Sequence, residues 1–214
     1  MIRATAVNGS PRMDMGYTAR ILNPFVEGMK EAGCETKNFF ASKLKVKSCV
    51  RGTMYCWYEN PGQCFIKDDM QLLYPVLKQS EILILASPVY IPLPGAMQNI
   101  LNRLCPLLEP VLEFRSGRTR ARLRNDVKIE KMVLIATCGW WEKENFDTLI
   151  RIVRELAEDA SVEFSGTVLR PHAFLMEQNG KLTAHGKAVL AAAKTAGKEL
   201  IINGEIKRET LFIA

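Results

Sequence analysis

The sequence lacks any run of the roughly 18 consecutive apolar residues that a membrane-spanning helix requires. Residues 1–8 also lack the charged start, long apolar run and cleavage site of a secretory signal. Hydrophobic residues make up 48% of the 214 positions and charged residues 24%, which argues against extended disorder. We therefore expect a soluble, cytoplasmic protein without membrane contact, and the length favours a single domain over residues 1–214.

Two common nucleotide-binding motifs are missing as well. The chain has no Walker sequence ending in Gly-Lys-Ser/Thr, and the loop after its first expected strand does not read Gly-x-Gly-x-x-Gly. These absences disfavour an NTPase and a classical dehydrogenase.

Positive charge is in excess, with a formal net charge of +6. Much of it lies in one segment, which contains Arg115, Arg118, Arg120, Arg122 and Arg124. No nucleic-acid-binding motif accompanies these arginines, and aromatic side chains are not interleaved with them. We interpret the segment as a solvated or subunit-contacting loop, with attraction of anions or nucleotides as the alternative, and we expect no nucleic-acid partner.

Strand and helix patterns alternate along the chain, which is typical of an α/β fold with a parallel sheet covered by helices. Residues 42–68 carry cysteines, glycine and proline and are interpreted as an insertion loop. The expected strands are 2–7, 35–40, 81–87, 131–136 and 162–169, and the expected helices are 17–32, 68–79, 95–104, 145–159 and 184–202.

Ligands of such sheets bind beyond the carboxyl ends of the strands, and three expected strands end in unusual loops, at 8–18, 87–91 and 137–141. The first loop has hydroxyls at Ser10 and Thr18, a cation at Arg12 and the start of a helix. A helix N-terminus with an added cation suits a phosphate group. The alternative is a hydroxyl-capped helix after a tight turn.

The other two loops carry the aromatic residues Tyr90, Trp140 and Trp141. A flat apolar ring such as an isoalloxazine needs a stacking surface and a few backbone donors, which these loops offer. The alternative is that the aromatic side chains pack against neighbouring loops or a second subunit.

Three motifs together resemble the NADPH-dependent FMN reductase and iron–sulfur flavoprotein family. They are Asn-Gly-Ser-Pro-Arg-Met at 8–13 followed by Gly-x-Thr at 16–18, Ser-Pro-Val-Tyr at 87–90, and Pro-Gly-x-Cys-x-Ile-Lys-Asp-Asp-Met at 61–70. The resemblance covers nearly the whole chain in order and spacing. It implies a flavodoxin-like three-layer sandwich, whose five-stranded parallel sheet has the order 2-1-3-4-5.

The resemblance also implies FMN as cofactor and NAD(P)H as co-substrate. Ser10, Arg12 and Thr18 would hold the phosphate, whereas the family often has Asn at the position of Tyr17. No acid–base residue is assigned, because the redox chemistry belongs to the cofactor. The implied FMN-binding residues are Ser10, Pro11, Arg12, Gly16, Tyr17, Thr18, Pro88, Val89, Tyr90, Ile91, Thr137, Cys138, Gly139 and Trp140.

The function that follows is an NAD(P)H-dependent FMN reductase, which passes electrons to flavin, quinone or another small acceptor. Members of the family assemble as dimers or tetramers, so we expect a homodimer or homotetramer. The alternatives are an iron–sulfur flavoprotein or flavodoxin-type electron carrier with a protein partner, and a module that binds FMN without turnover.

The cysteines at 49, 56 and 64 bear on the iron–sulfur alternative. The family's cluster takes four closely spaced cysteines, but Thr53 stands at the second position and Cys49 is out of register with Cys56. The only histidines, His172 and His185, are distant in sequence, which disfavours zinc. We therefore expect a degenerate loop with some buried cysteines and no metal ligands.

Overall fold

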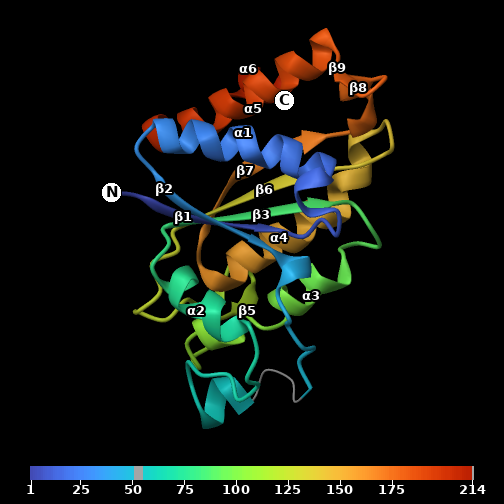
Figure 1. The fold of residues 1–214 in the computed structure, drawn as a ribbon. Coiled ribbons are helices and arrows are strands. Elements are labelled where there is room, and N and C mark those ends of the chain that lie inside the picture. The colour runs from blue at the N-terminus through green and yellow to red at the C-terminus, as the bar shows by residue number, and fades with distance from the viewer. Residues whose placement is uncertain (51–54, 214) are drawn as a thin grey trace.

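The computed structural model describes residues 1–50 and 55–213, and its centre is one parallel five-stranded sheet (Figure 1). The strand order is β2-β1-β3-β6-β7, so the predicted order 2-1-3-4-5 is confirmed once the short hairpin strands are set aside. The strands are β1 (Arg3–Asn8), β2 (Glu35–Phe40), β3 (Ile82–Pro88), β6 (Lys131–Thr137) and β7 (Glu163–Arg170).

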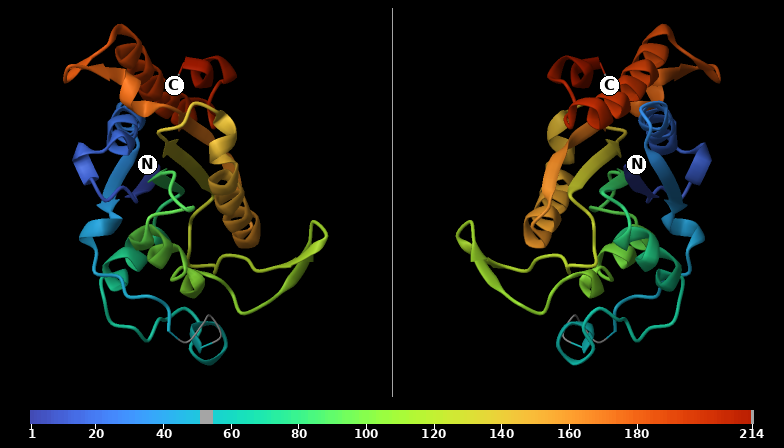
Figure 2. Two further views of the ribbon diagram at one scale, coloured as in Figure 1. Left: turned by 90° about the vertical axis from the view of Figure 1, so that its right-hand side faces the viewer. Right: turned by 90° about the vertical axis from the view of Figure 1, so that its left-hand side faces the viewer.

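Helices cover both faces of this sheet (Figures 1 and 2). Helices α1 (Tyr17–Glu31) and α5 (Ala184–Asn203) pack on one face, and α2 (Met70–Lys78), α3 (Gly95–Leu101) and α4 (Asp147–Ala160) on the other. Strand β3 is buried between the two layers and contributes alternate side chains to each core, which explains its continuous apolar sequence. A short helix, α6 (Arg208–Ile213), follows α5. None of the described helices is long and apolar enough to cross a membrane.

The arginine-rich segment forms a hairpin of β4 (Glu113–Arg115) and β5 (Arg118–Arg120), which projects from the body of the molecule (Figure 2). Arg118 and Arg120 each donate a hydrogen bond to Glu155 of α4, at 2.9 and 2.7 Å. Arg120 also pairs with Glu158 at 2.9 Å. The carboxylates of α4 thus neutralise much of the charge that the sequence concentrates here. A second hairpin, β8 (Glu177–Gln178) and β9 (Lys181–Leu182), precedes α5.

The end of α3 departs most from the expected helix boundaries, and the structure also identifies the residue that caps α2. Helix α3 ends at Leu101 instead of 104, because the chain then turns into a 3₁₀ helix at Cys105–Leu107 that contains Pro106. Of the two aspartates expected to cap α2, Asp68 does so, since its Oδ1 accepts the Met70 N–H at 3.1 Å.

Helices α1 and α5 approach each other closely at two glycines, Gly28 and Gly197. A Cβ at Gly28 would lie 1.9 Å from the Lys194 carbonyl oxygen, and one at Gly197 would lie 1.9 Å from that of Phe25. We expect Gly28→Ala to lower the free energy of unfolding by about 1–3 kcal/mol, because the helices must separate. Urea denaturation measures this.

Gly95→Ala is the matched control, because a Cβ there would meet nothing within 4 Å and the residue lies at the start of α3. A Gly28→Ala variant that unfolds at the same urea concentration as Gly95→Ala would contradict the close helix contact.

Candidate functional site

A pocket of about 290 Å³ lies where the loops after β1, β3, β6 and β7 meet, at the carboxyl edge of the sheet. Its volume is near the lower end of the roughly 300–1,000 Å³ usual for ligand pockets. The predicted residues that line it are Ser10, Arg12, Gly16, Tyr17, Thr18, Pro88, Val89, Tyr90, Thr137, Cys138 and Gly139. Three segments far apart in the sequence are therefore brought together as the topology predicts.

The loop after β1 is held in a compact turn by its own polar groups. The Asn8 side-chain oxygen accepts the Ser10 N–H at 2.9 Å, and the Ser10 hydroxyl accepts the Arg12 N–H at 3.3 Å. A Cβ at Gly16 would lie 2.6 Å from the Ser10 Oγ, so a larger residue there would displace the Ser10 hydroxyl. The turn leads directly into the first residue of α1, Tyr17.

Hydrogen bonds between the loops fix their relative positions. The buried hydroxyls of Thr18 and Thr137 are hydrogen-bonded at 2.9 Å, which joins the first turn of α1 to the end of β6. The Val89 N–H donates to the Thr137 carbonyl at 2.8 Å, and the Cys138 N–H donates to the Arg170 carbonyl at 3.1 Å. The pocket is therefore a preformed feature of the strand ends.

The chemistry of the pocket suits an anion. None of its lining residues is acidic, and the first turn of α1 supplies backbone N–H groups that have no acceptor within the helix. Arg12 is exposed and forms no ion pair with any described residue. The Asn8 Nδ2 is buried without a hydrogen-bond partner among the described residues, and so remains a spare donor beside the same turn. These donors fit a phosphate-bearing cofactor such as FMN.

The structure also places residues at the pocket that the sequence analysis missed. Ala173 and Phe174, after β7, line it together with the predicted residues. Behind them, the His172 ring stacks on Trp141 at 3.5 Å and contacts Phe174 at 4.0 Å, measured between ring centroids. The sequence did contain a signal for Ala173 and Phe174. They follow the expected strand at 162–169, and the loop after a parallel strand must lie at the carboxyl edge of the sheet.

Three predicted residues, Pro11, Ile91 and Trp140, are not among the side chains that line the pocket. All three are exposed, and each is next in sequence to a residue that lines the pocket. Their contact with a cofactor remains a prediction.

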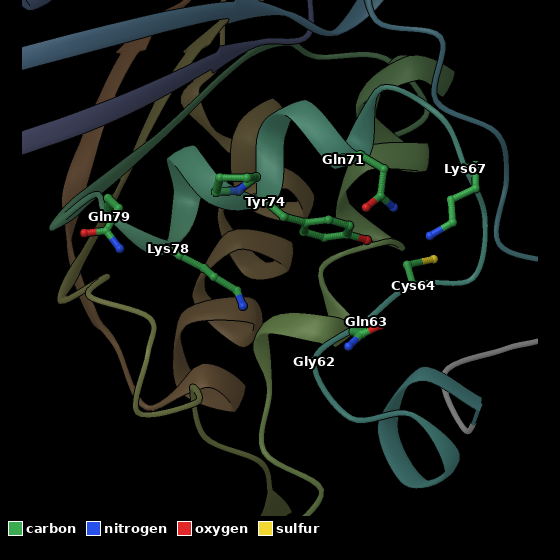
Figure 3. Close-up of a pocket in the computed structure, with 9 residues that line it drawn as sticks. Gly62, Gln63, Cys64, Lys67, Gln71, Tyr74, Lys78 and Gln79 are labelled. Carbon is green, nitrogen blue, oxygen red and sulfur yellow. The ribbon is translucent and has the colours of Figure 1, made fainter.

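A separate hollow of about 450 Å³ lies between α2 and residues 62–67 (Figure 3). Tyr74 points from α2 toward Cys64, and both side chains line this hollow. Lys78 at its edge is paired with Asp126 at 2.7 Å. None of the predicted FMN-binding residues lines this hollow.

The cysteines of the 42–68 segment come together, as the resemblance suggests, but with an unexpected addition. Cys49, Cys56 and Cys64 line one small cavity, and Cys105 from the 3₁₀ helix after α3 lines it too. The position of Thr53 lies outside the described residues. Among the residues that are described, no three His, Cys, Asp or Glu side chains are placed to hold a metal ion.

The chain is similar to known flavoproteins. Residues 2–125 match the family model described as NADPH-dependent FMN reductase. The chain is 29% identical over 118 residues to an iron–sulfur flavoprotein of Archaeoglobus fulgidus, which covers 54% of this chain and 52% of that protein. It is 32% identical over 89 residues to an iron–sulfur flavoprotein of Methanosarcina thermophila, covering 42% and 44%. The chain thus spans about half the length of these curated relatives.

Solved structures share the fold over nearly the full length. An NAD(P)H:quinone oxidoreductase from Methanothermobacter marburgensis superposes with a TM-score of 0.62 at 16% identity, covering 93% of this chain and 96% of that one. An FMN-dependent NADH-azoreductase from Bacillus anthracis, in complex with FMN, gives 0.61 at 13% identity, covering 95% and 99%. These structures support the flavodoxin-like fold. Since the family model covers more than half of the sequence, this protein belongs to the NADPH-dependent FMN reductase family.

Proposed function

We propose that the protein is an NAD(P)H-dependent flavin oxidoreductase that binds FMN at the carboxyl edge of its sheet. The observation that carries the proposal is the convergence of three predicted loops on one pocket. Among the described residues, none that lines the pocket is acidic and none forms an ion pair with Arg12. The family match and the FMN complex of the azoreductase with the same fold support this assignment.

The roles proposed for the residues follow from their chemistry. Arg12, the Ser10 hydroxyl and the first N–H groups of α1 would bind the phosphate. Thr18 is engaged with Thr137, so we assign it mainly to holding the loops together. Tyr90 and Gly139 would flank the flavin ring from opposite loops. When bound, FMN supplies hydride acceptance from the nicotinamide and electron transfer to a small acceptor.

We further propose that the protein acts in the cytoplasm as a homodimer or homotetramer. Tyr90, Ile91, Trp140, Trp141 and Phe174 are large apolar side chains between 45% and 102% exposed around the pocket. Such a rim is typical of a surface that contacts a ligand or another subunit.

An anaerobic visible spectrum, taken before and after addition of NADPH, tests the proposed function. We expect flavin absorbance that bleaches with NADPH and returns when a quinone is added, because the acceptor reoxidises the cofactor. Heat-denatured protein provides the control. A flavin that binds but is not reduced by NADPH or NADH would favour the electron carrier. A protein that neither contains nor binds FMN would refute the site assignment.

A further inference from the structure

The cysteine cavity joins two parts of the chain that are distant in sequence. Cys56 belongs to the π-helical turn Tyr55–Glu59, and Cys105 begins the 3₁₀ helix Cys105–Leu107. These two turns pack against each other, and the side chains of Cys56 and Cys105 line the same small cavity. Both side chains are buried, at 6% and 9% exposure.

The iron–sulfur cluster named in the relatives does not fit this cavity. The free space between the four cysteines is about 10 Å³, which is room for one water at most. A four-iron cluster needs far more space and four cysteine ligands. The described cysteines offer no group of three in a metal-binding arrangement, and the family's second ligand is replaced by Thr53.

We propose that Cys56 and Cys105 instead form a reversible disulfide when the protein is oxidised. The packing of the two short helical turns singles out this pair, whereas Cys64 also lines the separate hollow beside Tyr74. Cys49 is only half-buried at the cavity wall. The disulfide would link the 42–68 segment to the 3₁₀ helix that follows α3.

The chemistry balances with a small disulfide, such as oxidised glutathione, as oxidant. One protein thiolate attacks it and releases one glutathione thiolate, which leaves a mixed disulfide. The second protein thiolate then displaces the other glutathione. The two protein thiols lose two electrons and two protons in total, and the oxidant is reduced to two thiols.

Oxidation should be slow at neutral pH. Burial raises the pKa of the Cys105 thiol to about 12 and also raises that of Cys56. Because the thiolate is the attacking species, a raised pKa leaves little of it at pH 7, and the rate should increase with pH.

The test is peptide mapping of the native full-length protein after reduction, removal of the reductant and incubation with oxidised glutathione. We expect the mass of two hydrogen atoms to be lost, one cross-linked peptide pair containing Cys56 and Cys105, and recovery of both thiols with dithiothreitol. The cross-linked state should also melt at a higher temperature than the reduced state, because the disulfide constrains the unfolded chain.

Cys105→Ser should abolish the link, whereas Cys34→Ser, in the opposite core, should retain it. The wild-type map decides the proposal even if a variant does not fold. A link to Cys49 or Cys64, a mixed glutathione adduct alone, or unchanged thiols would overturn it. Iron and sulfide bound to anaerobically isolated protein would overturn it as well.

Discussion

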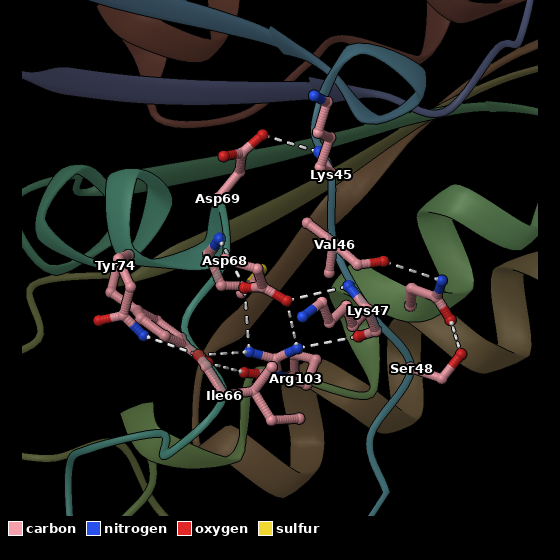
Figure 4. Close-up of polar contacts among 12 residues, drawn as sticks. Lys45, Val46, Lys47, Ser48, Ile66, Asp68, Asp69, Tyr74 and Arg103 are labelled. Carbon is pink, nitrogen blue, oxygen red and sulfur yellow. Dashed lines mark hydrogen bonds and ion pairs between the residues drawn. The ribbon is translucent and has the colours of Figure 1, made fainter.

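Arg103→Met is expected to lower the free energy of unfolding by about 3–5 kcal/mol, the cost of removing one partner from a buried ion pair. The Arg103 side chain is 1% exposed and that of Asp68 is 3% exposed. Its guanidinium donates to both Asp68 oxygens, at 2.9 and 3.2 Å, and to the Lys47 carbonyl at 2.8 Å (Figure 4). Urea denaturation measures the loss.

The size of this effect follows from what the pair holds together. Arg103 donates hydrogen bonds to the carbonyls of Lys47 and Ile66, which flank the three cysteines at 49, 56 and 64 in the sequence. Asp68 in turn accepts the backbone N–H of Lys47 at 2.9 Å. The Tyr74 hydroxyl donates to the Arg103 carbonyl at 2.7 Å and ties α2 to the same network. Loss of the guanidinium leaves a buried carboxylate and loosens both ends of the segment.

The double variant Arg103→Met with Asp68→Leu is the control, and it should recover part of the stability because no buried charge is left unpaired.

The dependence of the free energy of unfolding on acidic pH is a second measurement of the same ion pair. Burial opposes ionisation of Asp68, but hydrogen bonds from Arg103, Lys47 and Met70 outweigh it and lower the pKa. The native protein should therefore lose this stabilisation only as the pH falls below about 4. In Arg103→Met the buried Asp68 carboxylate has lost its largest stabilising partner, so the variant should regain part of its stability as the pH falls and Asp68 is protonated. A cost below about 1 kcal/mol would contradict the structural role.

The sheet could be predicted because its signals are local. Residues 82–86 and 132–136 are apolar throughout, and a strand with helices on both faces must be so. The order of the strands came from the family resemblance. The three pocket loops then followed, because parallel strands end at one edge.

Other features depend on contacts that no local pattern reports. The β4–β5 hairpin had a sequence signal, because Ser-Gly at 116–117 is a turn-forming dipeptide. In the structure both residues adopt the positive φ that a two-residue hairpin turn requires. The arginines around them suggested a loop instead. Cys105 gave no signal of its cavity, because its approach to Cys56 depends on how two short helical turns pack. Phe174 lines the pocket because β7 is parallel to the other strands, so the loop that follows it ends at the same edge of the sheet.

Arg12→Ala is expected to weaken FMN binding by about 10- to 100-fold, if the proposed phosphate site is correct. Arg12 has no carboxylate partner among the described residues, so its charge is available to the ligand. A hydrogen bond between charged groups contributes about 1.5–3 kcal/mol, which corresponds to this range of dissociation constants. Fluorescence titration of FMN into apoprotein measures the affinity.

Arg118→Ala is the matched control, because it removes the same charge from the β4–β5 hairpin, where Arg118 is paired with Glu155. Its FMN affinity should stay within about twofold of the native value. Raising the salt concentration should reduce the difference between Arg12→Ala and the native protein, since salt screens an exposed charge. Equal affinities for the two variants would mean that the net charge, and not the position of Arg12, attracts the cofactor. A direct contact thus predicts a large effect at one arginine and almost none at the other.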